Sequence, residues 1–413
     1  MKVILSAYAC EPGRGSEPGV GWNMAYEIAK HHQVWVLTSN THRPAIEAEL
    51  ARHQPPSLNF VYLDPLGWVY DWSSEGKRSQ WSVHLHYYLW QIWAYFVARS
   101  LHRQFSFDLA HHVTYVKYSS PSFLVFLSIP FIWGPVGGGE SAPQALWRDF
   151  SFRGKIYESL RMLARFIGEH DPFTRLTARR SVLSLATTKD TAERLHKIGA
   201  KKVQVFSQLG LPDEEITYLT QCGMSESSTQ HFVSIGRLLH WKGFHLGLRA
   251  FAQANLPNTE YWIVGEGPEK ERLQHLAFEL GISKQVKFWN KLARKETLDK
   301  LVGCLALIHP SLHDSGGLVC LEAMAAGYPV ICLDLGGPAL QVTEETGYKI
   351  PAHASEQAVN DLAKTMIHLA KNTEVRQSMG QAGQKRVREV FSWQARGYLL
   401  AQTYEEIIGH KFS

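Results

Sequence analysis

The sequence has few cysteines and no long hydrophobic run. Its five cysteines are far apart and form no C-x-x-C pair, which argues against a disulfide framework or a zinc ribbon and favours a reducing compartment. The longest apolar stretches, such as Pro121–Trp133, stop short of the roughly 18 residues that a membrane-spanning helix needs. The N-terminal MKVILSAYAC turns polar at Glu11, so we expect a first strand and no signal peptide.

Internal repeats and low-complexity tracts are also absent from the 413 residues. With 45% hydrophobic residues the chain can bury a large core, and its length predicts two or three domains. Residues 1–210 carry 23 Lys or Arg against 16 Asp or Glu, whereas residues 211–413 carry 20 against 22. Much of the excess lies in Arg153–Arg180, which suits either an anionic membrane surface or an ordinary solvated helix face.

Both halves repeat a short apolar strand, a glycine-rich turn and a helix. This pattern predicts an α/β fold with parallel sheets covered by helices on both faces, whose ligands bind beyond the carboxyl ends of the strands. The expected strands are Lys2–Tyr8, Val34–Thr38, Asn59–Leu63, Leu109–Val113, Phe131–Trp133 and Ser184–Thr187, then His231–Arg237, Tyr261–Gly267, Val286–Leu292, Ala306–Ser311 and Pro329–Asp334. A helix is expected at Trp22–Lys30.

We predict a first domain at residues 1–210, a linker at residues 211–230, a second domain at residues 231–390 and a C-terminal helix at residues 391–413. The linker is polar and ends in a Ser/Thr cluster. An aromatic-rich insertion at about residues 66–107, helical over Gln80–Arg103, could line an acceptor pocket, lie at a membrane interface or pack on its own domain. Its tryptophans are Trp68, Trp72, Trp81, Trp90 and Trp93.

The turn Glu11–Trp22 is rich in glycine and follows the first strand. Gly19 and Gly21 would let the backbone approach a ligand at a helix N-terminus, although a plain long turn is the alternative. The spacing fits neither the dinucleotide nor the P-loop fingerprint. A second turn carries Gly236-Arg237 and Lys242-Gly243; two cations at a strand's carboxyl end suit a diphosphate, or are surface charges.

The most informative segment is His309–Ile331, in which seven residues separate Asp314 from Glu322. Asp314 lies in a turn where its carboxylate can accept hydrogen bonds from hydroxyls. Glu322 lies on a helix among apolar residues, so its carboxylate is expected to be enclosed and to need partners such as ribose hydroxyls. The glycines of the turn, and the amides they would expose to phosphate or sugar oxygens, are Gly316, Gly317, Leu318 and Val319.

This segment resembles the E-x7-E motif of the retaining glycosyltransferases of family 4, which have the GT-B fold. The resemblance extends over residues 231–350 through three further segments: the Gly-Arg…Lys-Gly element, VGEGPEKERL at Val264–Leu273 and DLGGPALQV at Asp334–Val342. The first half of the chain matches only in its layout and its Gly-rich loop. The resemblance implies two Rossmann-like doubly wound domains that face each other across a cleft.

The resemblance also implies roles for individual residues. Arg237 and Lys242 would hold the diphosphate, Asp314 would contact the transferred sugar, and Glu322 would bind the ribose. The other implied donor contacts are Gly236, Gly316, Gly317, Leu318, Val319 and, near the base, Lys291 and Leu292. The residues that would lie near phosphate and acceptor are Gly19, Gly21, Gly137 and Gly138.

The sequence departs from the family pattern at two places. The first acidic position is Asp where the family usually has Glu, which leaves the identity of the transferred sugar open. No His follows Trp133, where many members have one; amides of Gly137–Gly139, or His111 or His112, could replace it.

The implied activity is retaining transfer of a sugar from a nucleotide-diphosphate donor, UDP before GDP, to a hydroxyl of a glycolipid or polysaccharide intermediate. No cofactor, metal or nucleic-acid partner is expected, and the expected place is the cytoplasm, with the inner face of the plasma membrane as an option. Two alternatives stay open. One is another GT-B enzyme, an epimerase or phosphorylase; the other is a non-catalytic nucleotide-sugar-binding or regulatory subunit.

Overall fold

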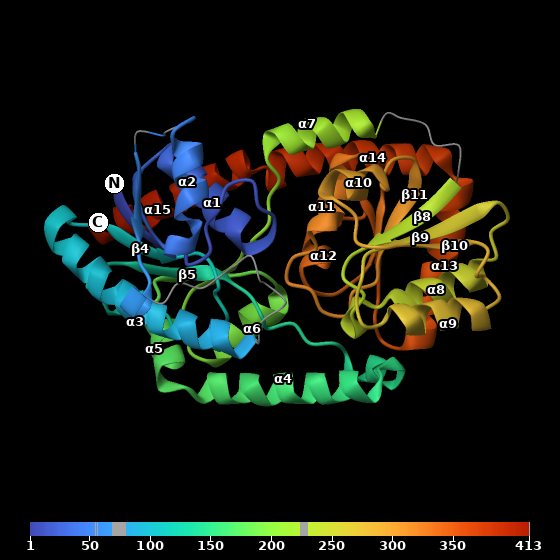
Figure 1. The fold of residues 1–413 in the computed structure, drawn as a ribbon, viewed down its shortest axis with the longest axis horizontal. Helices are drawn as coiled ribbons and strands as arrows, with labels where there is room; N and C mark the ends of the chain where they lie inside the picture. The colour runs from blue at the N-terminus through green and yellow to red at the C-terminus, as the bar shows by residue number, and fades with distance from the viewer. Residues whose placement is uncertain (54, 56, 68–79, 224–229, 413) are drawn as a thin grey trace. The chain divides into compact units, whose positions relative to one another are not determined.

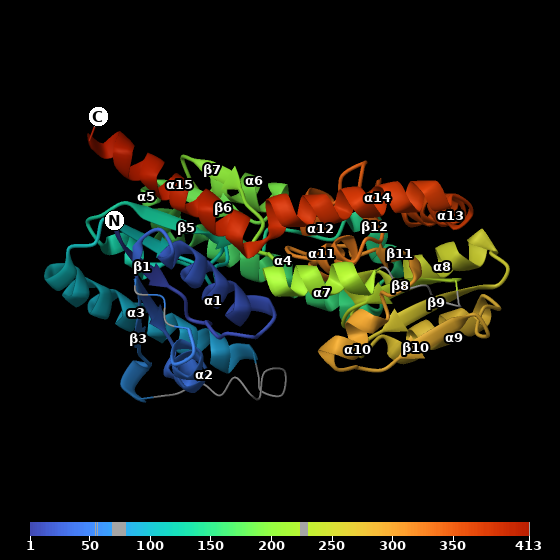
Figure 2. The same cartoon turned by 90° about the horizontal axis from the view of Figure 1, so that it is seen from above.

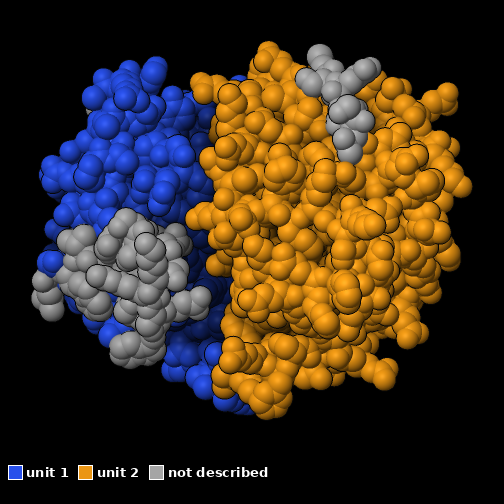
Figure 3. Space-filling view, turned by 45° about the vertical axis from the view of Figure 1, so that its right-hand side comes forward, with its two compact units in different colours: residues 1–139, 163–208, 393–413 blue, residues 140–162, 209–392 orange. Residues whose placement is uncertain are grey.

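The chain forms two compact units (Figures 1 and 3) in a computed structural model that describes residues 1–53, 55, 57–67, 80–223 and 230–412. Unit 1 comprises Met1–Gly139, Leu163–Gln208 and Trp393–Ser413; unit 2 comprises Glu140–Met162 and Leu209–Ser392. The domain boundary was predicted at residues 211–230, so the assignment of Glu140–Met162 to unit 2 was not expected. This segment packs with unit 2 because Leu146 and Phe150 are buried in that unit's core.

Unit 1 is built on a parallel sheet. Its elements are β1 (Lys2–Ser6), α1 (Ser16–Ala29), β2 (Gln33–Thr38), α2 (Arg43–Leu50), β3 (Leu58–Tyr62), α3 (Gln80–Phe105), β4 (Leu109–His112), β5 (Phe131–Val136), α5 (Pro172–Arg180), β6 (Leu183–Ala186), α6 (Lys189–Lys197), β7 (Val203–Val205) and α15 (Trp393–Phe412). The seven strands follow the order β3-β2-β1-β4-β5-β6-β7. Val3, Ile4 and Leu5 are fully buried, as expected for a strand covered on both faces.

Unit 2 repeats this architecture with six parallel strands in the order β10-β9-β8-β11-β12-β13. The strands are β8 (Gln230–Ile235), β9 (Thr259–Val264), β10 (Val286–Trp289), β11 (Cys304–His309), β12 (Val330–Leu333) and β13 (Gly347–Ile350). The helices are α7 (Asp213–Cys222), α8 (Phe244–Ala254), α9 (Lys270–Glu279), α10 (Arg294–Asp299), α11 (Leu318–Ala325), α12 (Gly336–Gln341), α13 (Ser355–Lys371) and α14 (Thr373–Arg386). Helix α4 (Phe152–His170) begins in unit 2 and ends in unit 1.

The predicted fold class is confirmed, with each expected strand present and helix α3 where it was expected. Strands β7 and β13 were not predicted. The predicted linker contains helix α7, while its Ser/Thr cluster falls in residues 224–229, outside the described residues. Trp68 and Trp72 also fall outside, as does the side chain of Trp81; Trp90 is buried and its indole donates to Leu63 O at 2.9 Å.

The C-terminal helix α15 packs on α1 within unit 1 (Figures 1 and 2). A Cβ on Gly397 would lie 2.3 Å from the Cβ of Glu27, so the two helices touch closely at this point. The last predicted segment, residues 391–413, is thus helical and belongs to unit 1 from Trp393 onward. Among the described residues, no helix has the length and apolar character that crossing a membrane would require.

Candidate functional site

Strands β8 and β11 are neighbours in the unit 2 sheet, although β9 and β10 come between them in the sequence. Sheets of this kind bind ligands where the strand order reverses, beyond the carboxyl ends of the strands. Arg237 follows β8 and Asp314 follows β11. Two motifs that are far apart in the sequence therefore reach the same edge of the sheet.

Lys242 and Asp314 form an ion pair, in which Lys242 Nζ donates a hydrogen bond to Asp314 Oδ2. His309 Nε2 lies 3.3 Å from the same oxygen, and the amide of Gly316 donates to Oδ1 at 3.1 Å. Burial raises the pKa of the Asp314 carboxyl, but Lys242 and His309 together lower it by more, so the pKa lies well below its ordinary value. Asp314 is consequently a carboxylate at neutral pH.

Gly243, directly after this lysine, holds the turn against the end of β11. Its φ is +66°, and a Cβ at this position would lie 1.9 Å from the carbonyl oxygen of Pro310. Only glycine fits such a close approach. The glycine of the Lys-Gly pair thus fixes where Lys242 stands relative to Asp314.

Arg237 differs from Lys242 in that its side chain is exposed and forms no ion pair with any residue the structure describes. It follows Gly236 at the carboxyl end of β8. The edge of the sheet therefore presents one cation that is neutralised by a carboxylate and one that is open to an external anion.

The turn before helix α11 presents amide groups at the same edge. Gly317 is the N-cap with φ +83°, and a Cβ there would lie 2.8 Å from Pro338 Cγ. The amides of Leu318 and Val319 open the helix, where backbone N–H groups lack intrahelical acceptors. Both residues are half-buried, so their amides can meet a phosphate or sugar oxygen.

Glu322 is buried, as predicted, but its partner in the structure is a cation. Arg294 lies 2.7 Å from Glu322 Oε1 and also pairs with Glu215 of helix α7. Burial raises the pKa of Glu322, and Arg294 offsets part of that rise. Neither Arg294 nor Glu215 was predicted from the sequence, in which the one signal was a basic residue at the start of the helix after Lys291 and Leu292.

Lys291 and Leu292 follow β10, which is the outermost strand of the sheet. They stand at the predicted edge, with Lys291 exposed and Leu292 half-buried. Strand β9 separates β10 from β8, so these two residues lie to one side of the Lys242–Asp314 pair. Such a position would suit a part of the ligand remote from its phosphates.

A buried carboxylate from helix α4 joins the two loops that carry Lys242 and Asp314. Glu158 Oε1 lies 3.2 Å from His240 Nε2 and 3.0 Å from His313 Nε2. Burial raises the pKa of Glu158, but the hydrogen bonds from the two histidines lower it by more, so that it stays ionised. The histidines directly precede Trp241-Lys242 and Asp314 in the sequence, and no sequence signal connected them with Glu158.

In unit 1, helix α1 begins at Ser16, so the expectation that it begins near Trp22 is wrong. Gly19 and Gly21 therefore lie inside the helix and are buried. A Cβ on Gly19 would lie 2.0 Å from Arg14 O, and one on Gly21 2.2 Å from Ala9 O. These glycines let the preceding loop pack on the helix, and their role toward phosphate and acceptor stays a prediction.

The glycines after β5 are also engaged within unit 1. The amide of Gly137 donates to Val116 O at 3.0 Å, and the amide of Gly139 donates to Thr191 Oγ1 at 3.1 Å. Both amides therefore have acceptors within unit 1, and their use by a substrate stays a prediction. The carbonyl of Gly138, at φ +95°, accepts a hydrogen bond from the guanidinium of Arg165.

The two histidines that end β4 are buried and neutral. His111 Nε2 contacts the carbonyl of Gly134, which can only accept, so Nε2 carries the proton and Nδ1 accepts from Tyr404 Oη. His112 Nε2 lies 2.9 Å from Tyr87 Oη. Burial lowers the pKa of His111 to about 4 and that of His112 to about 3. His112 stands at the carboxyl end of β4, and His111 ties β4 to α15.

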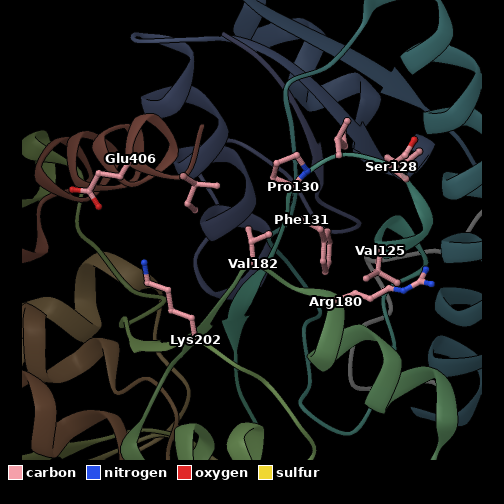
Figure 4. Close-up of a pocket in the computed structure, with 11 residues that line it drawn as sticks. Val125, Ser128, Pro130, Phe131, Arg180, Val182, Lys202 and Glu406 are labelled. Atoms are coloured by element: carbon pink, nitrogen blue, oxygen red, sulfur yellow. The ribbon is translucent and has the colours of Figure 1, made fainter. Parts of the chain in front are cut away.

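A cavity of about 600 Å³ also lies in unit 1, away from these strand ends (Figure 4). Phe131 begins β5, Val182 precedes β6 and Lys202 precedes β7, so the cavity opens at the amino edge of the sheet. Arg180 and Glu406 also line it. Its position is opposite to the edge where such sheets bind nucleotides. Among the described residues, no three His, Cys, Asp or Glu side chains gather as a metal site would need.

The part of the chain that carries this edge is similar to known glycosyltransferases. Residues 225–386 match the profile of the family described as Glycosyl transferases group 1. The D-inositol 3-phosphate glycosyltransferase of Corynebacterium jeikeium is 32% identical over 189 residues, which cover 43% of this chain and 44% of that protein. The lipopolysaccharide core biosynthesis glycosyltransferase LpsD of Rhizobium meliloti is 31% identical over 165 residues, covering 40% and 46%. The chain thus matches less than half the length of these relatives.

Solved structures match over the whole chain. The sucrose-phosphate synthase of Thermosynechococcus elongatus has a TM-score of 0.65 at 16% identity and covers 99% of both chains. Anabaena Alr3699/HepE in complex with UDP and glucose has a TM-score of 0.59 at 18% identity and covers 98% of this chain and all of that one. At such low identity these likenesses establish the fold alone, which is that of the GT-B proteins with two Rossmann-like domains.

Proposed function

We propose that the protein is a retaining glycosyltransferase of family 4 that transfers a sugar from a nucleotide-diphosphate donor to an acceptor hydroxyl. The observation that carries the proposal is the edge of the unit 2 sheet, where Lys242, Asp314 and Arg237 meet the first turn of α11. The cationic side chains and the α11 amides at this edge suit a diphosphate, and the adjacent Asp314 carboxylate suits the hydroxyls of a sugar.

The Lys242–Asp314 pair indicates how the donor would bind. A diphosphate that reaches this edge competes with Asp314 for Lys242 and finds the exposed Arg237 as its second cation. Once the Lys242 side chain turns toward the phosphate, the Asp314 carboxylate can accept hydrogen bonds from hydroxyls of the sugar. Amides of Leu318 and Val319 would add donors to the charge that grows on the departing phosphate.

We propose front-face attack with retention at the anomeric carbon, in which the departing phosphate takes the proton of the acceptor hydroxyl. The chain then contributes position and positive charge, and needs no nucleophile of its own. Arg237 and Lys242 would carry the neutralisation that a metal ion provides in other transferases. The anomeric configuration of the product, followed by NMR during the reaction, tests retention, and activity in excess EDTA tests metal independence.

UDP is the favoured donor nucleotide, and GDP is the second choice. Anabaena Alr3699/HepE, which shares the fold, was solved with UDP, and a relative from Corynebacterium glutamicum is named as GDP-mannose-dependent. The acceptor we favour is a lipid-linked or growing glycan, handled by an enzyme in peripheral contact with an anionic membrane. LpsD of Rhizobium meliloti is named for lipopolysaccharide core biosynthesis, which supports this acceptor class.

Thermal unfolding with UDP, GDP and ADP is the first experiment. A nucleotide at a hundredfold its dissociation constant stabilises the state it binds by about 2.7 kcal/mol, which raises the melting temperature measurably. A shift with one nucleotide identifies the donor class, and sugar nucleotides of that base are then assayed for release of nucleoside diphosphate. No shift with any nucleotide contradicts the proposal. A shift in melting temperature without release of nucleoside diphosphate, whichever acceptor is added, supports a non-catalytic nucleotide-sugar-binding subunit instead.

A further inference from the structure

Helix α4 turns its apolar side outward. Its exposed apolar residues recur at helical spacing along one face, with exposed fractions from 43% for Ile156 to 78% for Phe152. We name this face the α4 stripe: Phe152, Ile156, Leu160, Leu163, Phe166 and Ile167. A helix at the surface of a globular protein normally presents polar residues to water, so an apolar outer face marks a surface for a partner.

The inner side of α4 explains why its apolar residues face outward. In the half that belongs to unit 2, a Cβ on Gly154 would lie 3.1 Å from the ring of His240, and Glu158 binds the two histidines. In the half that belongs to unit 1, a Cβ on Gly168 would lie 2.4 Å from Ser119 O, and buried Glu169 pairs with Arg194 at 2.6 Å. Glycines and carboxylates thus occupy the face that packs, which leaves the apolar face outside.

The exposed charges of helix α4 and of the segment that follows it have one sign. Both glutamates of α4 are buried on its inner side and Asp171 is half-buried, so the exposed charged residues of the segment 152–180 are cations. They are Arg153, Lys155, Arg179 and Arg180. Helix α3 contains neither Asp nor Glu, and its Arg99 and Arg103 are exposed. Exposed apolar side chains flanked by cations fit a surface that is apolar inside and anionic outside.

Within unit 1 the apolar surface continues from α5 to α3 through three aromatic rings. Phe173 of α5 lies 5.9 Å from Phe123, and Phe123 lies 5.5 Å from Tyr88 of α3. Helix α3 adds exposed Trp93 and Phe96, at 44% and 56%. Trp and Tyr rings concentrate at the level of lipid headgroups, and Phe rings add apolar surface beside them. The aromatic insertion was predicted either to pack on its own domain or to lie at a surface for acceptor or membrane. One face of α3 does the first, because Trp90 is buried; the other face leaves Trp93 and Phe96 exposed.

We propose that the α4 stripe docks on the surface of an anionic phospholipid bilayer, with Phe152 to Ile167 among the acyl chains and Arg153 and Lys155 at the headgroups. This inference deepens the membrane contact in the proposed function and rests on it. A second copy of the chain would bring the same cations against the stripe and leave them unneutralised. An anionic lipid surface satisfies both the apolar residues and the charges.

Sedimentation of the full chain with vesicles tests the proposal. Vesicles of phosphatidylcholine with phosphatidylglycerol should bind the protein at low salt, and high salt should weaken binding because exposed charges are screened. The double variant Leu163→Gln/Ile167→Gln should lower the partition coefficient by about tenfold or more, since two apolar side chains no longer enter the lipid. Arg153→Gln/Lys155→Gln should lower it by about fivefold per cation on anionic vesicles only.

Phe278→Gln is the matched control, because Phe278 is 73% exposed on helix α9 of unit 2 and should leave vesicle binding unchanged. Absence of binding at low salt, or unchanged binding by Leu163→Gln/Ile167→Gln, overturns the proposal. Light scattering without vesicles provides a further outcome: an oligomer that this double variant dissociates would identify the stripe as a contact between copies and also overturns it. Nucleotide stabilisation, measured without lipid, separates failure of docking from failure of sugar transfer.

Discussion

Glu158 accepts a hydrogen bond from His313 through its Oε1 atom, at 3.0 Å, and this contact joins helix α4 to the residue directly before Asp314. The same oxygen lies 3.2 Å from His240, which is two residues before Lys242. One buried carboxylate is thus bonded to both loops whose side chains form the candidate diphosphate site. Glu158 is a positioning residue in this arrangement, because it acts on the site only through the two histidines.

We expect Glu158→Ala to cost about 2–4 kcal/mol of stability, since it removes the carboxylate to which the imidazoles of His240 and His313 donate. It should also weaken nucleotide binding, because the loops of Lys242 and Asp314 lose their common support. Glu158→Gln keeps an oxygen at the same place and should restore most of the nucleotide affinity. Calorimetric titration with UDP reads the difference. Equal affinity in Glu158→Ala and the wild type, both below their melting temperatures, would show that the loops hold their geometry without it.

Lys242→Ala should lower the rate of transfer on the order of 10²-fold or more, comparable to the loss of a group that stabilises a developing anion. The folded state should change little, because the variant also leaves Asp314 with His309 and the Gly316 amide as partners. Lys284→Ala, at an exposed position beyond helix α9, is the control and should keep full activity. Release of nucleoside diphosphate at saturating donor is the measurement. Unchanged turnover in Lys242→Ala contradicts its role.

The sequence was sufficient for every strand except β7 and β13, because the alternation of short apolar runs and glycine-rich turns is a local signal. It also singled out Lys242 and Asp314, which form an ion pair in the structure, and Glu322, which is buried; their roles toward a diphosphate and a ribose stay predictions. Strand β13 was missed because GYKI carries a glycine and a lysine and is recognised as a strand only through its pairing with β12. Long-range pairing of this kind leaves no periodic pattern in the sequence.

The partners of the site residues were not predictable for a related reason. Arg294 reaches Glu322 across the sheet edge, and Glu158 reaches His313 from a helix far away in the sequence. Neither contact has a characteristic spacing. Gly19 was assigned to a ligand, and the structure adds a packing reason for it, a carbonyl 2.0 Å from its would-be Cβ; close packing and close approach to a ligand select the same residue.

Gly243→Ala should destabilise unit 2 by about 3 kcal/mol and disturb the Lys242–Asp314 pair. The Cβ of an alanine at this position would lie 1.9 Å from Pro310 O, and the alanine backbone would also have to adopt φ +66°. Gly281→Ala separates these two effects, because Gly281 has φ +72° but no atom within 4 Å of a Cβ. It should cost about 1 kcal/mol, from the backbone conformation alone. Urea unfolding compares the two variants, and equal losses would mean that the contact with Pro310 relaxes at no cost.

Arg294→Met should destabilise the protein in a manner that depends on pH. Burial already raises the pKa of Glu322, and removal of Arg294 takes away the cation that opposes this rise. A carboxyl whose pKa is higher in the folded state than in the unfolded state binds its proton more tightly when folded, so its penalty is full above the folded pKa, declines as the pH falls through that pKa and is gone below the unfolded pKa. We therefore expect a loss of about 2 kcal/mol near pH 8, less than for a fully enclosed pair because the Arg294 side chain is 48% exposed, and a smaller loss near pH 5. Arg43→Met is the control, since the Arg43 and Glu47 side chains are 55% and 51% exposed and their pair should contribute little at any pH. Urea unfolding across this range is the measurement, and a deficit for Arg294→Met that stays constant with pH would mean that Glu322 does not depend on Arg294 for its charge.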